Sequence, residues 1–248
     1  MRKIDCYVAA AIFVLIAFSC GPIVVGGQPV TIGWQVTGSG SQCGTITTGL
    51  DWDYIYAHPA DDHYWNMQEH HIDPCVIDFG GDNIAYIDGV EIGVKLEGDP
   101  YIDFGFAARA GLSNTHFLFT SNLLLVNPAL INADGSAWAN PSPGYGATIL
   151  AGDFTDNKIY RAEYNGGTVF ADLSQAPIPP GGSNVAPSQS ILGQVTSMQT
   201  KWGFTLSGNR SQASGTSHFE ILGDVIPEPA SILLLGLGGL ALIRKPRA

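Results

Sequence analysis

The densest group of chemistry-bearing side chains lies early in the chain, where aromatic rings alternate with carboxylates. The rings are Trp52, Tyr54, Tyr64 and Trp65, and they stand among Asp51, Asp53, Asp61 and Asp62. Flat rings stack on sugar faces and carboxylates accept hydrogen bonds from hydroxyl groups, so this composition is typical of a carbohydrate-binding surface. The alternation of Trp52, Tyr54 and Tyr56 would equally place three rings on the core side of one strand. Both interpretations stay open at this stage.

The surrounding segment is strongly acidic, which raises the question of calcium. Residues 51–103 hold thirteen of the chain's 22 acidic residues and one basic residue, Lys95. Calcium takes six to eight oxygen ligands, but Asp78–Asp82 and Asn132–Gly135 lack the alternating ligand series and the terminal glutamate of an EF-hand. We therefore predict a solvated acidic surface and no cofactor, and we keep calcium as an alternative.

Four of the six histidines are close together in sequence and could in principle bind zinc or copper. They are His58, His63, His70 and His71. In a strand, His70 and His71 would point to opposite faces, and no HExxH order is present. The interpretation is therefore surface or loop histidines, with no metal site.

Motifs of covalent catalysis are absent from the sequence, which has no G-x-S-x-G elbow and no P-loop. The separation of two catalytic carboxylates, as in glycoside hydrolysis, is a property of the fold and not of sequence spacing. We expect a protein that is not an enzyme, with an extracellular hydrolase as the third hypothesis.

The N-terminal segment has the order of a secretory signal peptide. Arg2 and Lys3 precede the apolar run Val8–Phe18, and small residues follow at the end of that run. We predict a signal helix over residues 1–19, with cleavage after Ser19 or as late as Gly26. A buried N-terminal helix is the alternative.

The C-terminal segment combines a short motif, an apolar stretch and a basic end. Pro227, Glu228 and Pro229 are followed by the apolar stretch Ala230–Ile243, and the basic end contains Arg244, Lys245 and Arg247. A fourteen-residue helix rises about 21 Å, short of a hydrocarbon core of about 30 Å. The cationic flank can extend to the headgroups and orients the C-terminus toward the cytoplasm, so we predict a transmembrane helix. A buried core helix is the alternative.

This ordered combination resembles the PEP-CTERM sorting signal over residues 225–248. The resemblance implies export, transient anchoring in the inner membrane of a Gram-negative bacterium and processing by an exosortase near the Pro227–Pro229 motif. It also implies an association with extracellular polysaccharide. The exported domain would then be residues 20–224. The resemblance implies nothing about the activity of that domain.

Cysteine usage in the exported domain suggests one disulfide. Cys6 leaves with the signal and Cys20 leaves if cleavage is late, so Cys43 and Cys75 remain as a pair in an oxidising compartment. A bridge closing a loop of about thirty residues would add roughly 3 to 4 kcal/mol by the loop-entropy model. Two free buried thiols and a metal-thiolate pair are the alternatives.

Composition and local patterning favour an all-β domain. The chain has 31 Gly and 15 Pro, and its strand-like segments are separated by turn residues. Ile84–Val94 is predicted to be a hairpin with its turn at Asp88-Gly89, because Asp-Gly suits a two-residue turn. Ala176–Pro187 is predicted to be a long loop. The other expected strands are Pro29–Thr37, Tyr101–Arg109, Thr115–Val126, Ala147–Phe154, Lys158–Tyr164, Gly167–Asp172, Ile191–Leu206 and Thr216–Leu222.

These segments predict an antiparallel β-sandwich or jelly roll. A formal net charge of −11 and a pI of about 4.7 disfavour nucleic acid as a partner. The functional hypothesis is an exported structural or adhesive protein of the cell surface or extracellular matrix. The alternative is a lectin-like module that uses the aromatic cluster near Trp52–Trp65, with or without calcium.

Overall fold

The computed structural model describes residues 30–47, 75–95, 99–144, 146–178, 184–191 and 193–225, all within the compact unit Pro29–Ile226. The predicted signal helix, the predicted transmembrane helix and the rings Trp52, Tyr54, Tyr64 and Trp65 lie outside the described residues. Within those residues, no helix has the length and apolar character to cross a bilayer.

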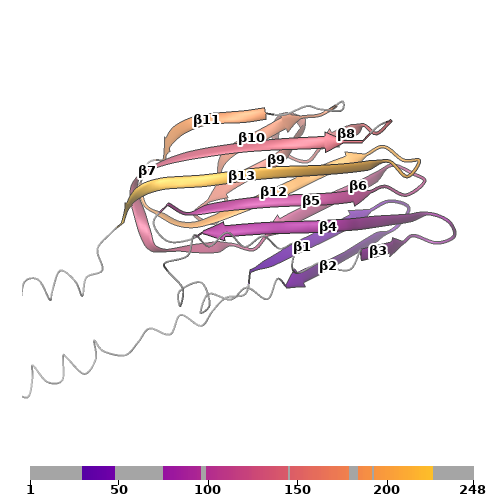
Figure 1. Ribbon diagram of the computed structural model, residues 1–248, viewed down its shortest axis with the longest axis horizontal. Helices are drawn as coiled ribbons and strands as arrows, with labels where there is room; N and C mark the ends of the chain where they lie inside the picture. Colours follow the sequence, from indigo (N-terminus) through magenta and orange to yellow (C-terminus); the bar gives the residue numbers. More distant parts are fainter. Residues whose placement is uncertain are drawn as a thin grey trace, which may run out of the picture. The chain divides into compact units, whose positions relative to one another are not determined.

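Thirteen strands make up one antiparallel sheet, and the predicted all-β class is confirmed (Figure 1). The hydrogen-bonded order is β2-β1-β6-β12-β7-β13-β5-β4-β3, with β8 and β9 added to β12, β10 to β9 and β11 to β7. The strands are β1 (Thr31–Thr37), β2 (Ser41–Thr47), β3 (Cys75–Asp78), β4 (Ile84–Lys95), β5 (Tyr101–Arg109), β6 (Thr115–Ser121), β7 (Leu124–Pro143), β8 (Ile149–Gly152), β9 (Lys158–Tyr164), β10 (Thr168–Gln175), β11 (Asn184–Ile191), β12 (Val195–Leu206) and β13 (Gln212–Val225). A single-turn 3-10 helix, η2 (Thr155–Asn157), precedes β9.

The two ends of this strand order come close together, so the sheet is nearly closed. The side-chain amide of Gln42 on β2 donates to the carbonyl oxygen of Asp78 on β3 at 2.9 Å. Nearby, the Asn83 amide donates to the Ser39 hydroxyl at 2.9 Å. The seam between β2 and β3 is therefore bridged by side chains.

The core lies between two halves of the sheet, which β7 connects. Near its start β7 pairs with β12, and from Leu130 onward it pairs with β13. Across the core, the Phe106 ring of β5 lies 5.0 Å from the Trp202 ring and 4.9 Å from the Phe204 ring of β12, measured between centroids. These rings are almost completely buried, and burying such large side chains is the main driving force for the fold.

Strict alternation decides which side chains face the core. In β6 the buried and partly exposed positions alternate along THFLFTS, so Phe117 and Phe119 point inward. β5 has the same pattern apart from Gly105, and its bounds match the predicted strand. The bounds of β9 also match, although consecutive pairs of residues are buried along it. Period-two patterning was therefore a reliable guide where one face is buried and the other meets solvent.

The predicted hairpin at Asp88-Gly89 is wrong. These two residues lie inside β4, which pairs with β5 from Tyr86 to Lys95, and the register shifts between Ile87 and Gly89. The irregularity is a β-bulge, which lets Ile87 and Val90 both face the core although they are three residues apart. The extra burial favours one long strand over a turn, and the chain reverses between Lys95 and Tyr101.

Several other segments differ from prediction. The expected strand Thr115–Val126 is interrupted after Ser121, and no strand was predicted over β2, β3 or most of β7. β11 takes up residues 184–187 of the expected loop Ala176–Pro187 and ends at Ile191, the first residue of the expected strand Ile191–Leu206. The calcium-like segment Asn132–Gly135 lies within β7, which the sequence did not reveal because Pro141 and Pro143 follow. At those prolines β7 pairs with β13, whereas its pairing with β11 ends at Ala139, so the prolines lie on a locally open edge that tolerates a missing N–H.

Candidate functional site: an aromatic row and a trough on the outer sheet face

Strands β4, β5, β13 and β7 present a continuous outer face. Outward side chains have odd numbers on β5 and even numbers on β13, as the alternation of burial shows. The strand register aligns them in transverse rows: His218 lies opposite Asp103 on one side and Trp138 on the other. The next row along the strands places Thr216 opposite Gly105 and Asn140. Successive rows are about 6.6 to 6.8 Å apart.

Three rings form what we call the aromatic row: Tyr101, His218 and Trp138. The His218 ring lies 6.0 Å from the Trp138 ring at an interplanar angle of 17°, and 5.6 Å from the Tyr101 ring at 31°. Trp138 is 37% exposed, a high value for a residue type that is mostly buried. The row therefore places one exposed indole beside two partly exposed rings on paired strands.

Carboxylates flank the central ring of the row. His218 Nδ1 lies 2.7 Å from Asp103 Oδ1, and His218 Nε2 lies 3.8 Å from Glu220 Oε2. The hydrogen bond to Asp103 raises the pKa of His218 above its ordinary value, against the opposing effect of partial burial. The imidazole is thereby held in one orientation between the two neighbouring rings.

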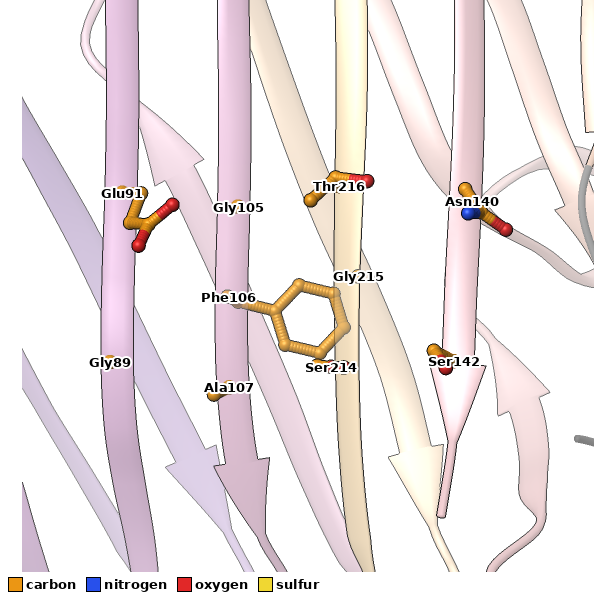
Figure 2. Close-up of a pocket in the computed structure, with 10 residues that line it drawn as sticks. All are labelled: Gly89, Glu91, Gly105, Phe106, Ala107, Asn140, Ser142, Ser214, Gly215 and Thr216. Carbon is orange, nitrogen blue, oxygen red and sulfur yellow. The ribbon is translucent and has the colours of Figure 1, made fainter. Parts of the chain in front are cut away.

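Beside the aromatic row lies a depression of about 310 Å³, which we call the small-residue trough (Figure 2). Its floor and rim consist of small or short polar residues, one carboxylate and Phe106. The lining residues are Gly89, Glu91, Gly105, Phe106, Ala107, Asn140, Ser142, Ser214, Gly215 and Thr216.

Glycines make the trough shallow and open. A Cβ atom at Gly215 would lie 2.5 Å from the Phe106 ring and 3.2 Å from the Trp202 ring, so the core rings pack directly beneath a residue without a side chain. At Gly105, the absent side chain leaves room for Glu91, whose Oε2 would be 3.6 Å from an added Cβ. Glu91 therefore points from β4 toward Gly105 on β5, as Figure 2 shows.

The far end of the trough has a second polar and aromatic group. Arg109 lies over the Tyr86 ring, with its guanidinium carbon 5.0 Å from the centroid, and it contacts Asp88 at 3.3 Å. This cation is therefore already engaged by a ring and a carboxylate. The trough runs from this group to the aromatic row.

Metal binding has no support within the described part of the chain, where no cluster of three or more His, Cys, Asp or Glu residues is arranged to hold an ion. Asp78 instead accepts a hydrogen bond from the Gly80 backbone N–H at 2.7 Å. Asp134 accepts one from Ser190 at 2.8 Å. Much of the acidic stretch and all four clustered histidines lie outside the described residues, so calcium stays a prediction there.

The predicted Cys43–Cys75 disulfide also stays a prediction. Cys43 is an exposed, unbridged thiol on β2, opposite Gln35 of β1. The backbone of Cys75 opens β3, opposite Ile87, but its side chain lies outside the described residues. The two strands are those that meet at the seam, where Gln42 and Asp78 are joined.

Sequence reasoning missed the aromatic row. Trp138 and Asn140 show the outward spacing of a strand, but no strand was predicted around them. Tyr101 and Asp103 lie in a predicted strand whose neighbours could not be known. His218 meets Asp103 across a separation of 115 residues, so only the sheet register brings the group together.

The fold and this face define an all-β protein whose described part is one nearly closed antiparallel sheet with an accessible aromatic row. Residues 225–248 match the family model for the PEP-CTERM protein-sorting motif. The match supports a PEP-CTERM protein: an exported chain that is sorted by an exosortase and is anchored in a membrane before it reaches the surface. No curated protein and no solved structure matches the chain.

Proposed function

We propose that the protein is an adhesive component of the cell surface that binds extracellular polysaccharide through the aromatic row, without cleaving it. The single observation that carries this proposal is the accessible stack of Tyr101, His218 and Trp138 on a rigid sheet face. After release from transient anchoring in the inner membrane, the domain would meet matrix polysaccharide outside the cell.

Sugar stacking is the chemistry that such a row supports best. The C–H groups on one face of a pyranose ring are apolar, and an exposed indole offers a matching flat surface with a large contact area. Trp138 lies on a strand paired on both sides, with β13 and β11, so its position is fixed by backbone hydrogen bonds and not by a loop. Little conformational entropy is therefore lost on binding.

Hydroxyl recognition would come from the polar side chains next to the rings. Asn140 follows Trp138 at the next outward position of β7, and Thr216 lies opposite Asn140 on β13. An amide and a hydroxyl can each donate and accept hydrogen bonds, which suits sugar hydroxyl groups. Several weak contacts of this kind, repeated along a polymer, would give adhesion by multivalency.

The decisive variant is Trp138→Ala in the full chain, purified in detergent. We expect at least about a tenfold loss of affinity for extracellular polysaccharide, because the central stacking contact is removed. Binding is measured by co-sedimentation with insoluble matrix polysaccharide and by glycan-array titration.

Val169→Ala is the matched control, since Val169 is 44% exposed on β10, outside the proposed site. The control should bind as the unmodified protein does. Equal binding by the Trp138→Ala variant would contradict the proposal. Release of new reducing ends from the polysaccharide would instead support an extracellular hydrolase.

Export is tested separately by deleting residues 227–248. The shortened protein should leave the membrane fraction and appear in the soluble periplasmic or secreted fraction, because the predicted anchor is gone. Unchanged membrane association of this variant would contradict the proposed anchoring.

A further inference from the structure

We infer that the small-residue trough selects polysaccharides with free amino groups, with Glu91 as the residue that contacts the ammonium. This inference rests on the proposed function, because it assigns a ligand class to the same outer face. It follows from the charge around the trough and from the state of the Glu91 side chain.

The described side chains on this face carry an excess of negative charge. Around the trough and the aromatic row, the described carboxylates are those of Asp88, Glu91, Asp103 and Glu220, and the cationic groups are Arg109 and, when protonated, His218. Even with His218 protonated, four carboxylates face two cations. A uronate or sulfated polymer would be repelled, whereas a polymer of amino sugars would be attracted.

Within the described part of the chain, Glu91 differs from these other carboxylates in having no partner. Asp88 contacts Arg109, and both Asp103 and Glu220 contact His218. Glu91 is exposed on β4, and the described residues include no hydrogen-bond or ion-pair partner for it. Its carboxylate lies beside Gly105, at the rim of a depression of about 310 Å³, where a ligand ammonium could reach it without displacing a side chain.

The spacing suits one oligosaccharide that contacts both parts of the face. Glu91 and Asn140 lie in the same transverse row, separated by three strand spacings or about 14 Å, and Trp138 lies in the adjacent row. A sugar stacked on Trp138 therefore leaves Glu91 for a different residue of the same polymer. Stacking would supply the affinity and Glu91 the discrimination between polymers.

The test compares three soluble probes of equal length: de-N-acetylated glucosamine oligosaccharides, their fully N-acetylated counterparts and oligouronates. Binding to the full chain in detergent is titrated at about pH 6, below the pKa of an amino group. We expect the de-N-acetylated probe to bind about three- to fivefold more tightly than the N-acetylated probe, and oligouronates to bind least. This preference should weaken in about 0.5 M salt.

The discriminating variant is Glu91→Gln, with Asp82→Asn as its control, because Asp82 is an exposed carboxylate on the turn between β3 and β4. Glu91→Gln should abolish the preference and leave binding of the N-acetylated probe unchanged, and Asp82→Asn should change neither. Equal binding of both glucosamine probes by the unmodified protein, or tighter binding of oligouronates, would overturn this inference and leave polysaccharide binding intact. Absence of binding to every probe and to matrix polysaccharide would overturn the proposed function as well.

Discussion

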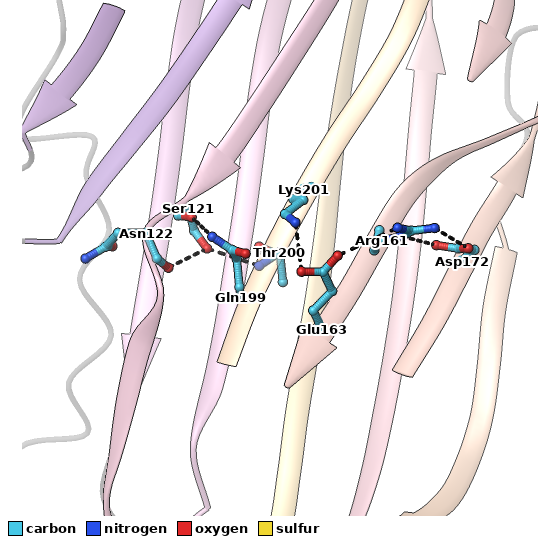
Figure 3. Close-up of polar contacts among 8 residues, drawn as sticks. All are labelled: Ser121, Asn122, Arg161, Glu163, Asp172, Gln199, Thr200 and Lys201. Atoms are coloured by element: carbon cyan, nitrogen blue, oxygen red, sulfur yellow. Dashed lines mark hydrogen bonds and ion pairs between the residues drawn. The ribbon is translucent and has the colours of Figure 1, made fainter. Parts of the chain in front are cut away.

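The outer faces of the two sheet halves use their polar side chains in opposite ways. On the face of β6, β12, β9 and β10, charged groups contact one another in what we call the ion ladder: Lys201, Glu163, Arg161 and Asp172 (Figure 3). On the face of β4, β5, β13 and β7, rings are exposed and Glu91 has no partner among the described residues. The charged groups of the first face contact one another, whereas the second face carries the groups that we propose bind a ligand.

The charged groups of the ion ladder contact one another at short distances and are partly buried. The Lys201 ammonium lies 2.7 Å from Glu163, and Arg161 holds Asp172 with two hydrogen bonds of 2.7 and 2.9 Å. Partial burial acts to raise the pKa of Asp172, but the hydrogen bonds from Arg161 and Thr155 outweigh it, so the pKa lies below its ordinary value. Next to the ladder, the Gln199 amide donates to the Ser121 carbonyl oxygen at 2.7 Å.

The difference teaches that charge on a sheet surface is not by itself a sign of binding. Ladder groups would have to exchange a protein partner for a ligand, so little free energy would be gained. On ligand binding, groups in the trough and the aromatic row would give up only bound water and part of their solvent exposure. Stability should therefore depend on the first face and ligand binding on the second.

The largest effect on stability is expected for Arg161→Ala. The change removes both hydrogen bonds to Asp172, the contact with Glu163 at 3.8 Å and the stacking over Phe154. We expect a loss of about 2 to 3 kcal/mol, or a decrease in Tm of about 5 to 10 °C, measured by calorimetry.

Arg210→Ala is the control for that variant, since Arg210 is an exposed arginine on the turn before β13. The Arg161→Ala variant should keep its affinity for polysaccharide. If Arg161→Ala lowered the free energy of unfolding by less than about 0.5 kcal/mol, the proposed contrast in stability between the two faces would be contradicted.

An intermediate, pH-dependent effect is expected for His218→Gln. Because the folded-state pKa of His218 is raised above 6.5, the protonated side chain stabilises the fold fully below about pH 6.5, and this contribution is lost as the pH rises through the folded-state pKa. The stability difference from the unmodified protein should be on the order of 1 kcal/mol at about pH 5.5 and should decrease toward about pH 8.5. A difference that stays constant or grows with pH, in chemical denaturation at both pH values, would show that Asp103 does not stabilise the imidazolium.

The smallest effect on stability is expected for Glu91→Gln. Its side chain is exposed and has no described partner, so the free energy of unfolding should change by less than about 0.5 kcal/mol. Urea denaturation of both proteins measures this difference. A negligible change in the free energy of unfolding, together with a loss of the preference for amino sugars, would show that Glu91 acts in binding and Arg161 in stability. A loss above about 1 kcal/mol would assign Glu91 a structural role.

Local sequence patterns were sufficient for some elements and misleading for others. β5 and β9 could be delimited because each has strand-forming residues bounded by turn residues, and β5 also alternates in burial apart from Gly105. The Asp88-Gly89 pair has the chemistry of a turn, yet the burial of Ile87 and Val90 on the same side favoured a bulge within β4. Turn propensity is local, whereas burial depends on the neighbouring strands, and here burial was the larger effect.

The candidate site could be predicted only as a type of chemistry. An aromatic and acidic sugar-binding surface near Trp52–Trp65 was the alternative hypothesis, and that segment lies outside the described residues. The described aromatic row combines Tyr101, Trp138 and His218 from three separate strands. Alternation places each of them on an outer face, but no local pattern states that β5, β13 and β7 are neighbours.

The sequence by itself determined that the described domain is all-β and that the chain carries a sorting motif at residues 225–248. Both conclusions depend on contiguous residues. The β class follows from alternation within strands, and the sorting motif is a short tripeptide followed by an apolar stretch and a basic end. The tertiary structure alone decided which charged side chains pair with one another and which have no partner among the described residues. Asp103 meets His218 across 115 residues and Glu163 meets Lys201 across 38, because pairing between distant strands is set by the burial of the whole core.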